Sequence, residues 1–281
     1  MPLIVKICGL STRETLDVAL DAGADMVGFV FFPPSPRHLS LETARELGKH
    51  AKRRAVKVAL TVDADDATLA NIVEALQPDI LQLHGRETVA RLRDIKQKFG
   101  LPVMKAMPVE TSADLAALPG YAAVADRILF DGRAPKEATR PGGLGAAFDW
   151  HVLENLDLKL PFMVSGGLNA QNLAEAVRVT RAGGVDVSSG VERTPGVKDP
   201  EMIREFIRAA RAADLTSPRP VYGERSDRSC DPGEGELPHS SLSPNSGKQP
   251  LTPTLQERAS LVSTPQVRGE GAEAALRGNK S

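Results

Sequence analysis

The chain has 281 residues, of which 41% are hydrophobic and 25% are charged. This composition is typical of a globular protein with a sizeable core, and it excludes a chain that is disordered throughout. The 35 lysines and arginines nearly balance the 36 aspartates and glutamates, so the net charge of −1 gives no indication of a nucleic-acid partner.

The two cysteines, Cys8 and Cys230, are too few for a disulfide framework, which favours a reducing compartment. The N-terminal segment MPLIVKICGL has no basic start, and Lys6 interrupts its apolar run, so a signal peptide is not predicted. No apolar run approaches the ~18 residues that a membrane span needs. We therefore expect a cytoplasmic protein with no membrane partner.

Eight short runs of apolar and β-branched residues follow one another along the chain and predict eight strands. Most of them show little alternation of apolar and polar residues, which is typical of strands buried on both faces of a parallel sheet. The predicted strands span residues 4–8, 26–31, 56–62, 80–83, 103–106, 128–130, 162–164 and 185–187.

Stretches with helical signals lie between these runs. Ser11 and Glu14 have the spacing of a capping box, and Gly23 stands where the helix that follows them should end. Asp199 and Pro200 predict the start of the last helix. The other predicted helices span residues 40–53, 65–76, 87–99, 112–118, 148–156 and 170–181.

Eight strands that alternate with helices indicate parallel βα units, for which a (β/α)8 barrel and a doubly wound open sheet are the alternatives. The dinucleotide fingerprint GxGxxG is missing after the first strand, where ICGLSTRE stands instead. This absence favours a single (β/α)8 TIM barrel, which we predict for residues 1–213.

The composition changes near Asp214. Residues 214–281 contain eight of the 21 prolines, together with ten serines and seven glycines, but no isoleucine, phenylalanine, methionine or tryptophan. Such a segment buries too little apolar surface to offset the entropy lost on ordering. We predict a disordered tail over 214–281; a second small domain is the alternative, which no periodic pattern supports.

In barrel enzymes the site lies at the carboxyl ends of the strands. Ser165-Gly166-Gly167-Leu168-Asn169 follows the seventh strand and Ser188-Ser189-Gly190 follows the eighth. Glycines let backbone N–H groups approach an anion, and these two loops form the usual phosphate site of the fold. We predict phosphate contacts from Gly166, Gly167, Ser189 and Gly190; the alternative is ordinary turns that need glycine.

Three further residues near strand ends are candidates for chemistry. Cys8 is either a small buried hydrophobe or a base, and a thiol acts as a base only when its pKa is lowered. Asp131 follows a buried strand and is either a general acid or a structural carboxylate, as a helix N-cap or in an ion pair with Arg133. Arg37, in the loop Ser35-Pro36-Arg37, is either a fixed fork for a carboxylate or phosphate or a solvated charge.

His84 stands alone at the end of the fourth strand. A metal site needs several converging ligands, and the sequence shows no such cluster, so we expect neither a metal nor a cofactor. A structural histidine is the first interpretation of His84, and a substrate contact is the second.

Together these motifs resemble the phosphoribosylanthranilate isomerases of tryptophan biosynthesis, in order over about residues 3–212. The segments that carry the resemblance are Lys6-Ile7-Cys8-Gly9-Leu10, Gly28-Phe29-Val30-Phe31, Ser35-Pro36-Arg37, Gln82-Leu83-His84-Gly85, Phe148-Asp149-Trp150, Ser165-Gly166-Gly167-Leu168, Asp186-Val187-Ser188-Ser189-Gly190-Val191-Glu192 and Pro195-Gly196-Val197-Lys198-Asp199. One departure is Leu144 in Gly142-Gly143-Leu144-Gly145, where the family usually has threonine.

The resemblance implies an aldose–ketose isomerase that performs the Amadori rearrangement of N-(5-phosphoribosyl)anthranilate. It implies Cys8 as the general base, Asp131 as the general acid and Arg37 as the ligand of the anthranilate carboxylate. The partner is then a small phosphoribosyl substrate, and the chain is expected to be a monomer or a homodimer. Two alternatives are another phosphosugar isomerase or epimerase, and a barrel that binds a sugar phosphate without catalysis.

Overall fold

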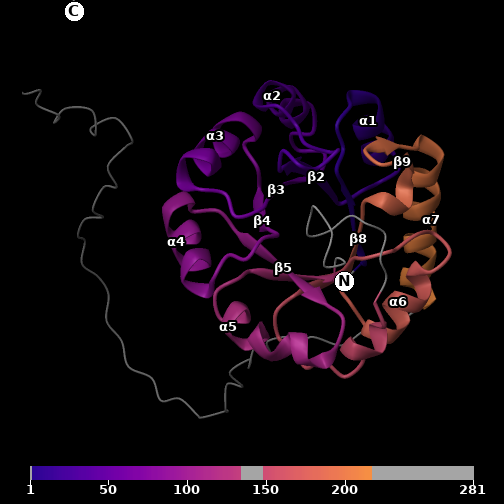
Figure 1. Cartoon of the computed structure of the whole chain (residues 1–281). Helices are drawn as coiled ribbons and strands as arrows, with labels where there is room; N and C mark the ends of the chain where they lie inside the picture. Colours follow the sequence, from indigo (N-terminus) through magenta and orange to yellow (C-terminus); the bar gives the residue numbers. More distant parts are fainter. Residues whose placement is uncertain (1, 134–147, 217–281) are drawn as a thin grey trace, which may run out of the picture. The chain divides into compact units, whose positions relative to one another are not determined.

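A closed barrel of eight parallel strands forms the centre of the computed structural model, which describes residues 2–133 and 148–216. Figure 1 looks along the barrel, with the helices arranged around the ring of strands. The strands are β1 (Ile4–Cys8), β2 (Met26–Phe31), β3 (Val56–Thr61), β4 (Ile80–Leu83), β5 (Val103–Val109), β6 (Arg127–Gly132), β7 (Phe162–Val164) and β8 (Gly184–Val187). The predicted (β/α)8 barrel is confirmed.

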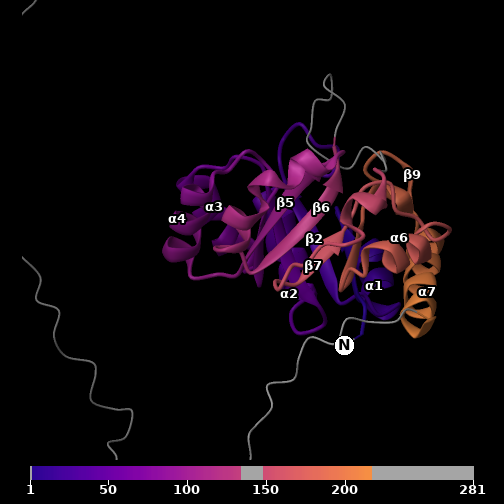
Figure 2. The same ribbon diagram turned by 90° about the horizontal axis from the view of Figure 1, so that it is seen from below.

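The helices lie outside the ring, and α7 packs against both α1 and α6. They are α1 (Arg13–Asp21), α2 (Leu41–His50), α3 (Asp66–Leu76), α4 (Val89–Phe99), η1 (Ser112–Ala117), α5 (Leu118–Ala122), η2 (Trp150–Leu153), α6 (Leu173–Thr180), η3 (Ser189–Val191) and α7 (Pro200–Thr216). A hairpin of β9 (Glu192–Thr194) and β10 (Val197–Lys198) follows η3. Figure 2 shows β9 at the upper end of the barrel, which is the carboxyl end of the strands.

Two layers of side chains explain why the strands show so little alternation. Residues that point inward fill the barrel, and those that point outward pack beneath the helices, so both faces are apolar. The inner cluster consists of Met26, Val58, Met104, Ala106, Leu129 and Met163. Because side chains alternate between the faces of a strand, Asp131 points inward like Leu129, two residues before it. Polar residues in inward positions therefore meet at the axis.

The two ends of the sheet meet where β1 pairs with β8, and this pairing closes the barrel. In this register Lys6 lies beside Asp186, and on the other side of β1 Cys8 lies beside Gly28 of β2. Closure thus brings the first and the last predicted strands together. It determines which side chains face each other near Cys8.

Local signals explain most helix ends, with one correction at α1. The N-cap is Thr12, whose side chain accepts from the N–H of Thr15, so the predicted Ser11–Glu14 capping box is wrong. Gly23 has a φ of 92°, as the predicted helix end requires. Asp199 accepts from the N–H groups of Glu201 and Met202 at the start of α7, which confirms that prediction.

Other differences concern short elements. The predicted helix over 148–156 is only the 3₁₀ helix η2. The predicted helix over 112–118 is the 3₁₀ helix η1 (Ser112–Ala117), which continues into α5 from Leu118. The hairpin of β9 and β10 was not predicted. Its two strands are two and three residues long, too short for a pattern of period two to identify them.

The last helix extends past the predicted boundary at Ala213 to Thr216. The carboxylate of Asp214 accepts a hydrogen bond of 2.9 Å from the N–H of Leu3, just before β1. The folded part thus includes at least three residues that the change in composition assigns to the tail. The rest of the predicted tail, from residue 217, and the Gly142–Gly145 loop lie outside the described residues.

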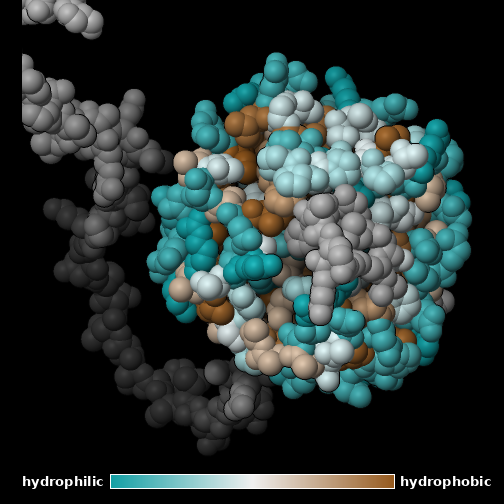
Figure 3. Space-filling model, viewed as in Figure 1, coloured by the Kyte–Doolittle hydropathy of each residue, from teal (hydrophilic) through white to brown (hydrophobic). Residues whose placement is uncertain are grey.

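The outer surface of the helices is largely hydrophilic in the view of Figure 3. This distribution agrees with helices that bury one face against the sheet and expose the other to water. Among the described residues, no helix is both long and apolar enough to cross a membrane.

Candidate active site

Cys8 and Asp131 both lie inside the barrel at the carboxyl ends of their strands. Cys8 is the last residue of β1 and Asp131 is the fifth residue of β6, and both side chains are buried. In the ring, β7 and β8 separate β6 from β1. A thiol and a carboxyl group therefore approach the mouth of the barrel from two different directions.

Lys6 lies one layer below Cys8 on the same strand, and it is completely buried. Its ammonium Nζ donates to Oδ1 of Asp186 on β8 at 2.8 Å. Burial acts to lower the pKa of Lys6, but the Asp186 carboxylate and Cys8 outweigh burial, so the pKa is raised above its ordinary value. The Asp186 carboxylate therefore favours the charged form of Lys6 beneath the thiol.

Burial also acts on the thiol itself. It raises the pKa of Cys8, because the thiolate would lose its hydration in the barrel. Lys6 and Lys198 oppose this effect and Asp186 adds to it, and the net result is a pKa above the ordinary value. A base at this position therefore depends on the cations around it.

Asp131 has a different environment, in which an imidazole is the nearest charged or chargeable group. Nε2 of His84 lies 3.2 Å from Oδ2 of Asp131. The side-chain amide of Gln82 donates to Nδ1 of His84 at 3.3 Å, which places the ring proton on Nε2, facing Asp131. The structure thus brings together His84 and Asp131, which the sequence analysis had treated separately.

Arg37 is buried, so the interpretation as a solvated surface charge is wrong. Its guanidinium binds the Glu192 carboxylate through two parallel hydrogen bonds of 2.7 Å. The Lys198 ammonium contacts the same carboxylate at 2.8 Å and also the Ser188 carbonyl at 2.8 Å. Two cations thus share one carboxylate. These contacts lower the pKa of Glu192 although its burial acts to raise it.

Gly9 explains how Arg37 comes to pack against the end of β1. Gly9 has a φ of 78°, and a Cβ at this position would lie 2.5 Å from Cδ of Arg37 and 3.3 Å from Oγ of Ser188. Only glycine lets the loops after β1, β2 and β8 approach so closely. Cys8 thus ends β1, and Gly9 after it provides the surface against which Arg37 packs.

The loops after β7 and β8 touch each other. A Cβ on Gly190 would lie 1.9 Å from the Leu168 carbonyl, so this contact needs glycine. Gly166 and Gly167 both have positive φ, at 83° and 64°. Within residues 2–133 and 148–216, no acceptor for the N–H groups of Gly166 and Gly167 is found. These groups are placed as an anion site requires.

The sequence model of the family described as N-(5'phosphoribosyl)anthranilate (PRA) isomerase matches residues 5–209. The chain belongs to this family. It is 82% identical to the N-(5'-phosphoribosyl)anthranilate isomerase of Bradyrhizobium diazoefficiens over 217 residues, which cover 77% of this chain and 97% of that protein. The resemblance inferred from the motifs is thereby confirmed.

Solved structures of phosphoribosylanthranilate isomerases have the same fold. The Thermotoga maritima enzyme has a TM-score of 0.68 and 34% identity, and the alignment covers 75% of this chain and 99% of that one. A complex of such an isomerase with reduced 1-(o-carboxyphenylamino)-1-deoxyribulose 5-phosphate has a TM-score of 0.65 and 32% identity, with the same coverage.

Five residues around the predicted isomerase site had no assigned role in the sequence analysis. A charged residue in an otherwise buried strand needs a partner, and this signal could have identified two of the five. Lys6 interrupts the apolar run of the first strand, and Asp186 that of the eighth. The other three carry no such signal, because their partners depend on the folded loops. The five residues are Lys6, Gln82, Asp186, Glu192 and Lys198.

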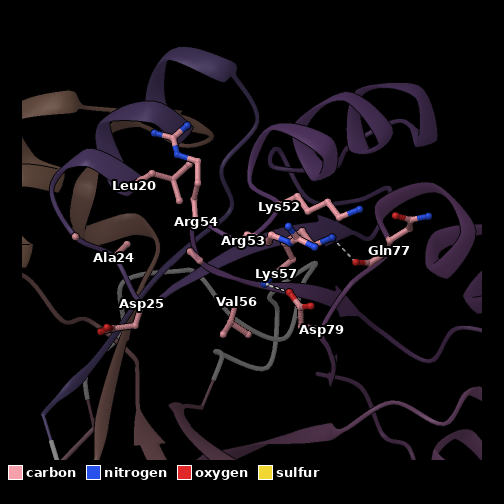
Figure 4. A pocket seen from close by; sticks show the side chains of 12 residues that line it. Leu20, Ala24, Asp25, Lys52, Arg53, Arg54, Val56, Lys57, Gln77 and Asp79 are labelled. Carbon is pink, nitrogen blue, oxygen red and sulfur yellow. Dashed lines mark hydrogen bonds between the residues drawn. The ribbon is translucent and has the colours of Figure 1, made fainter.

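A depression of about 860 Å³ lies at the amino ends of β2, β3 and β4, at the other end of the barrel from Cys8. Figure 4 shows its side chains, none of which belongs to the predicted isomerase site. Asp25 accepts from the N–H of Val5 and from Arg211, and Asp79 accepts from the N–H of Lys57. These contacts join strands and helices, so the depression is a structural feature. The described residues contain no cluster of three metal-ligating side chains.

Proposed function

We propose that this protein catalyses the rearrangement of N-(5-phosphoribosyl)anthranilate to 1-(2-carboxyphenylamino)-1-deoxyribulose 5-phosphate, with Cys8 as base and Asp131 as acid. The observation that carries the proposal is the pair of inward-facing groups at the carboxyl ends of β1 and β6, separated by β7 and β8. A thiol and a carboxyl group so placed can act on two sides of one sugar. Membership of the isomerase family supports the same reaction.

The protons balance in two stages. Asp131 donates a proton to the ribose ring oxygen, and the bond from this oxygen to the anomeric carbon breaks to give a Schiff base. Cys8 then removes the proton from the neighbouring sugar carbon, which gives an enolamine. Tautomerisation moves the enol proton to the former anomeric carbon and leaves the ketone. No electron leaves the substrate, so the reaction is a redox-neutral isomerisation.

His84 supports the acid in this scheme. Its Nε2 lies 3.2 Å from Oδ2 of Asp131 and carries the ring proton, because Gln82 donates to its other ring nitrogen. The proton that Asp131 transfers would then lie on Oδ1. We infer that His84 orients the carboxyl group and lies beside the substrate.

Binding is divided between the two ends of the substrate. We infer that Arg37 binds the anthranilate carboxylate, and that Glu192 fixes the plane of the guanidinium for this contact. The loops with Gly166, Gly167, Ser189 and Gly190 would bind the phosphate. The cytoplasmic location and the monomeric or homodimeric state stay predictions of the sequence.

The test is a fluorescence assay with freshly generated phosphoribosylanthranilate on the purified full chain. We expect loss of substrate fluorescence with wild-type protein and almost none with Cys8→Ser or Asp131→Asn. Binding of a reduced product analogue to both variants is the control that the site is intact. A folded wild-type protein without turnover would contradict the function; turnover with Cys8→Ser at the wild-type rate would contradict the role of the thiol.

A further inference from the structure

We propose that Lys6 is a positioning residue whose buried ammonium stabilises the Cys8 thiolate, and that Asp186 holds this ammonium in place. The inference rests on the proposed role of Cys8 as the base. It concerns a residue that does not touch the reacting atoms and acts through the thiol.

The position of Lys6 follows from the barrel. Lys6 and Cys8 are two residues apart on β1, so both side chains point inward. Lys6 lies beside Asp186 in the β1–β8 register, and both side chains are buried. The 2.8 Å contact between Nζ and the carboxylate fixes the ammonium at the wall of the barrel.

Gly28 brings the ammonium and the thiol into one space. A Cβ on Gly28 would lie 2.9 Å from the Cys8 sulfur and 3.1 Å from Nζ of Lys6. Both distances are measured from the same Cβ position on Gly28, so the Cys8 sulfur and the Lys6 Nζ are at most 6.0 Å apart. An opposite charge within ~4–6 Å lowers the pKa of an acid by about one to three pH units. The absence of a side chain on Gly28 therefore permits a direct electrostatic contact.

The charged groups that face Cys8 come from three elements. Lys6 on β1 and Lys198 on β10 favour the thiolate, and Asp186 on β8 opposes it. Burial lowers the pKa of Lys198. The carboxylate that pairs with Lys198 belongs to Glu192, and this carboxylate also binds Arg37. The pKa of Lys6 is instead raised. The surroundings of Lys6 therefore favour its charged form more than those of Lys198 do.

Lys6 resolves a conflict in the proposed mechanism. Burial alone would keep Cys8 as a neutral thiol, which is a poor base. The ammonium opposes this effect and makes the thiolate easier to form, although the pKa of Cys8 stays above its ordinary value. The thiolate then takes the proton from the sugar carbon and becomes a thiol again.

The experiment titrates Cys8 in full-length protein that carries Cys230→Ser, so that Cys8 is the only cysteine. Thiolate absorbance in the ultraviolet and the acidic limb of kcat/KM are followed against pH. The variants are Lys6→Met and the double variant Lys6→Met with Asp186→Asn, which avoids an unpaired buried carboxylate. Lys57→Met is the matched control, because Lys57 is also buried but donates to the Leu76 and Gln77 carbonyls at the other end of the barrel.

We expect both Lys6 variants to move the thiol titration and the acidic limb to higher pH, by about one to three pH units for Lys6→Met. At a fixed pH below the limb, kcat/KM should fall about tenfold for every pH unit by which the limb moves. The double variant should move the limb less, because Asp186 opposes the thiolate. Lys57→Met should leave both curves in place.

Two outcomes separate this inference from the proposed function. If Cys8→Ser abolishes turnover while neither folded Lys6→Met nor the folded double variant titrates at a higher pH than wild type, Lys6 has only a structural role and the inference is wrong. If Cys8→Ser retains wild-type turnover, the role of the base itself fails. Lys6→Arg is the rescue variant, and a titration restored toward wild type would support a charge effect.

Discussion

The two proposed catalytic groups lie in contrasting surroundings at the same end of one barrel. The Cys8 side is rich in buried charge, with two ion-paired networks: Lys6 with Asp186, and Glu192 with both Arg37 and Lys198. The Asp131 side contains one imidazole and the amide of Gln82, whose Oε1 has no hydrogen-bond partner among the described residues. Charge surrounds the thiol, and the His84 imidazole contacts the carboxyl group.

This difference follows from what each group must do. A buried thiol becomes a base only when cations favour its anion, and the cations that act on Cys8 are the ammonium groups of Lys6 and Lys198. A carboxyl group that donates a proton must not face cations that favour its anion, and among the described residues no lysine or arginine forms an ion pair with Asp131. We therefore expect substitutions of the charged groups around Cys8 to shift the acidic limb of the pH profile, and substitutions of the neighbours of Asp131 to change the rate without moving that limb.

The largest effects are expected from the catalytic groups themselves. Cys8→Ser and Asp131→Asn should each reduce kcat by ~100- to 10,000-fold, which is the usual contribution of a positioned acid or base. The wild-type pH profile should be a bell, with thiolate formation on the acidic limb and loss of the acid's proton on the alkaline limb. The residual activity of Cys8→Ser should lose the rising limb, and that of Asp131→Asn the falling limb. If Cys8→Ser instead lost the falling limb and Asp131→Asn the rising limb, the roles of base and acid would be the reverse of those proposed.

A smaller effect is expected from Arg37, which belongs to the charged side. Arg37→Ala should cost about 2–4 kcal/mol of transition-state stabilisation, seen mainly in KM, because a bidentate contact with the substrate carboxylate is lost. Arg37→Lys should recover only part of this loss, since lysine has no planar fork. Steady-state kinetics with a substrate series measure the split between KM and kcat. An alanine variant with unchanged kinetics would refute the carboxylate contact.

Gln82 tests the hydrogen-bonded side. Gln82→Leu keeps the volume but removes the donor to His84, and the loss of one hydrogen bond corresponds to about 0.5–1.5 kcal/mol. We expect kcat to fall about two- to tenfold, with the acidic limb of the pH profile unchanged because no charge near Cys8 is altered. A displacement of this limb in Gln82→Leu would mean that the two sides are coupled.

The smallest effect is expected outside both regions. A chain that ends after Thr216 should keep wild-type kcat and thermal stability, because α7 is complete. A chain that ends at Ala213 provides the comparison, since it lacks the Asp214 contact with Leu3 and should melt at a lower temperature. If the chain that ends after Thr216 lost activity, residues 217–281 would have a role in the site.

Much of the fold could be predicted because its signals are local. The strand bounds of β1, β2, β4 and β7 agree with the apolar runs, since strands buried on both faces need no polar residues. The predicted cap at Ser11 was wrong because Thr12, the next residue, can accept the same type of hydrogen bond. Two neighbouring hydroxyl residues give the same sequence signal, and only the path of the chain selects between them.

The sequence by itself determined the eight βα units, the strand ends that hold Cys8, Asp131 and His84, and the family. Each of these depends on residue types at short spacing. Only the tertiary structure decided the ionic contacts, such as that between Lys6 and Asp186, which are 180 residues apart. Such a pair exists because barrel closure sets the register of β1 against β8, and a register between distant strands is fixed by the packing of the whole barrel rather than by either strand alone.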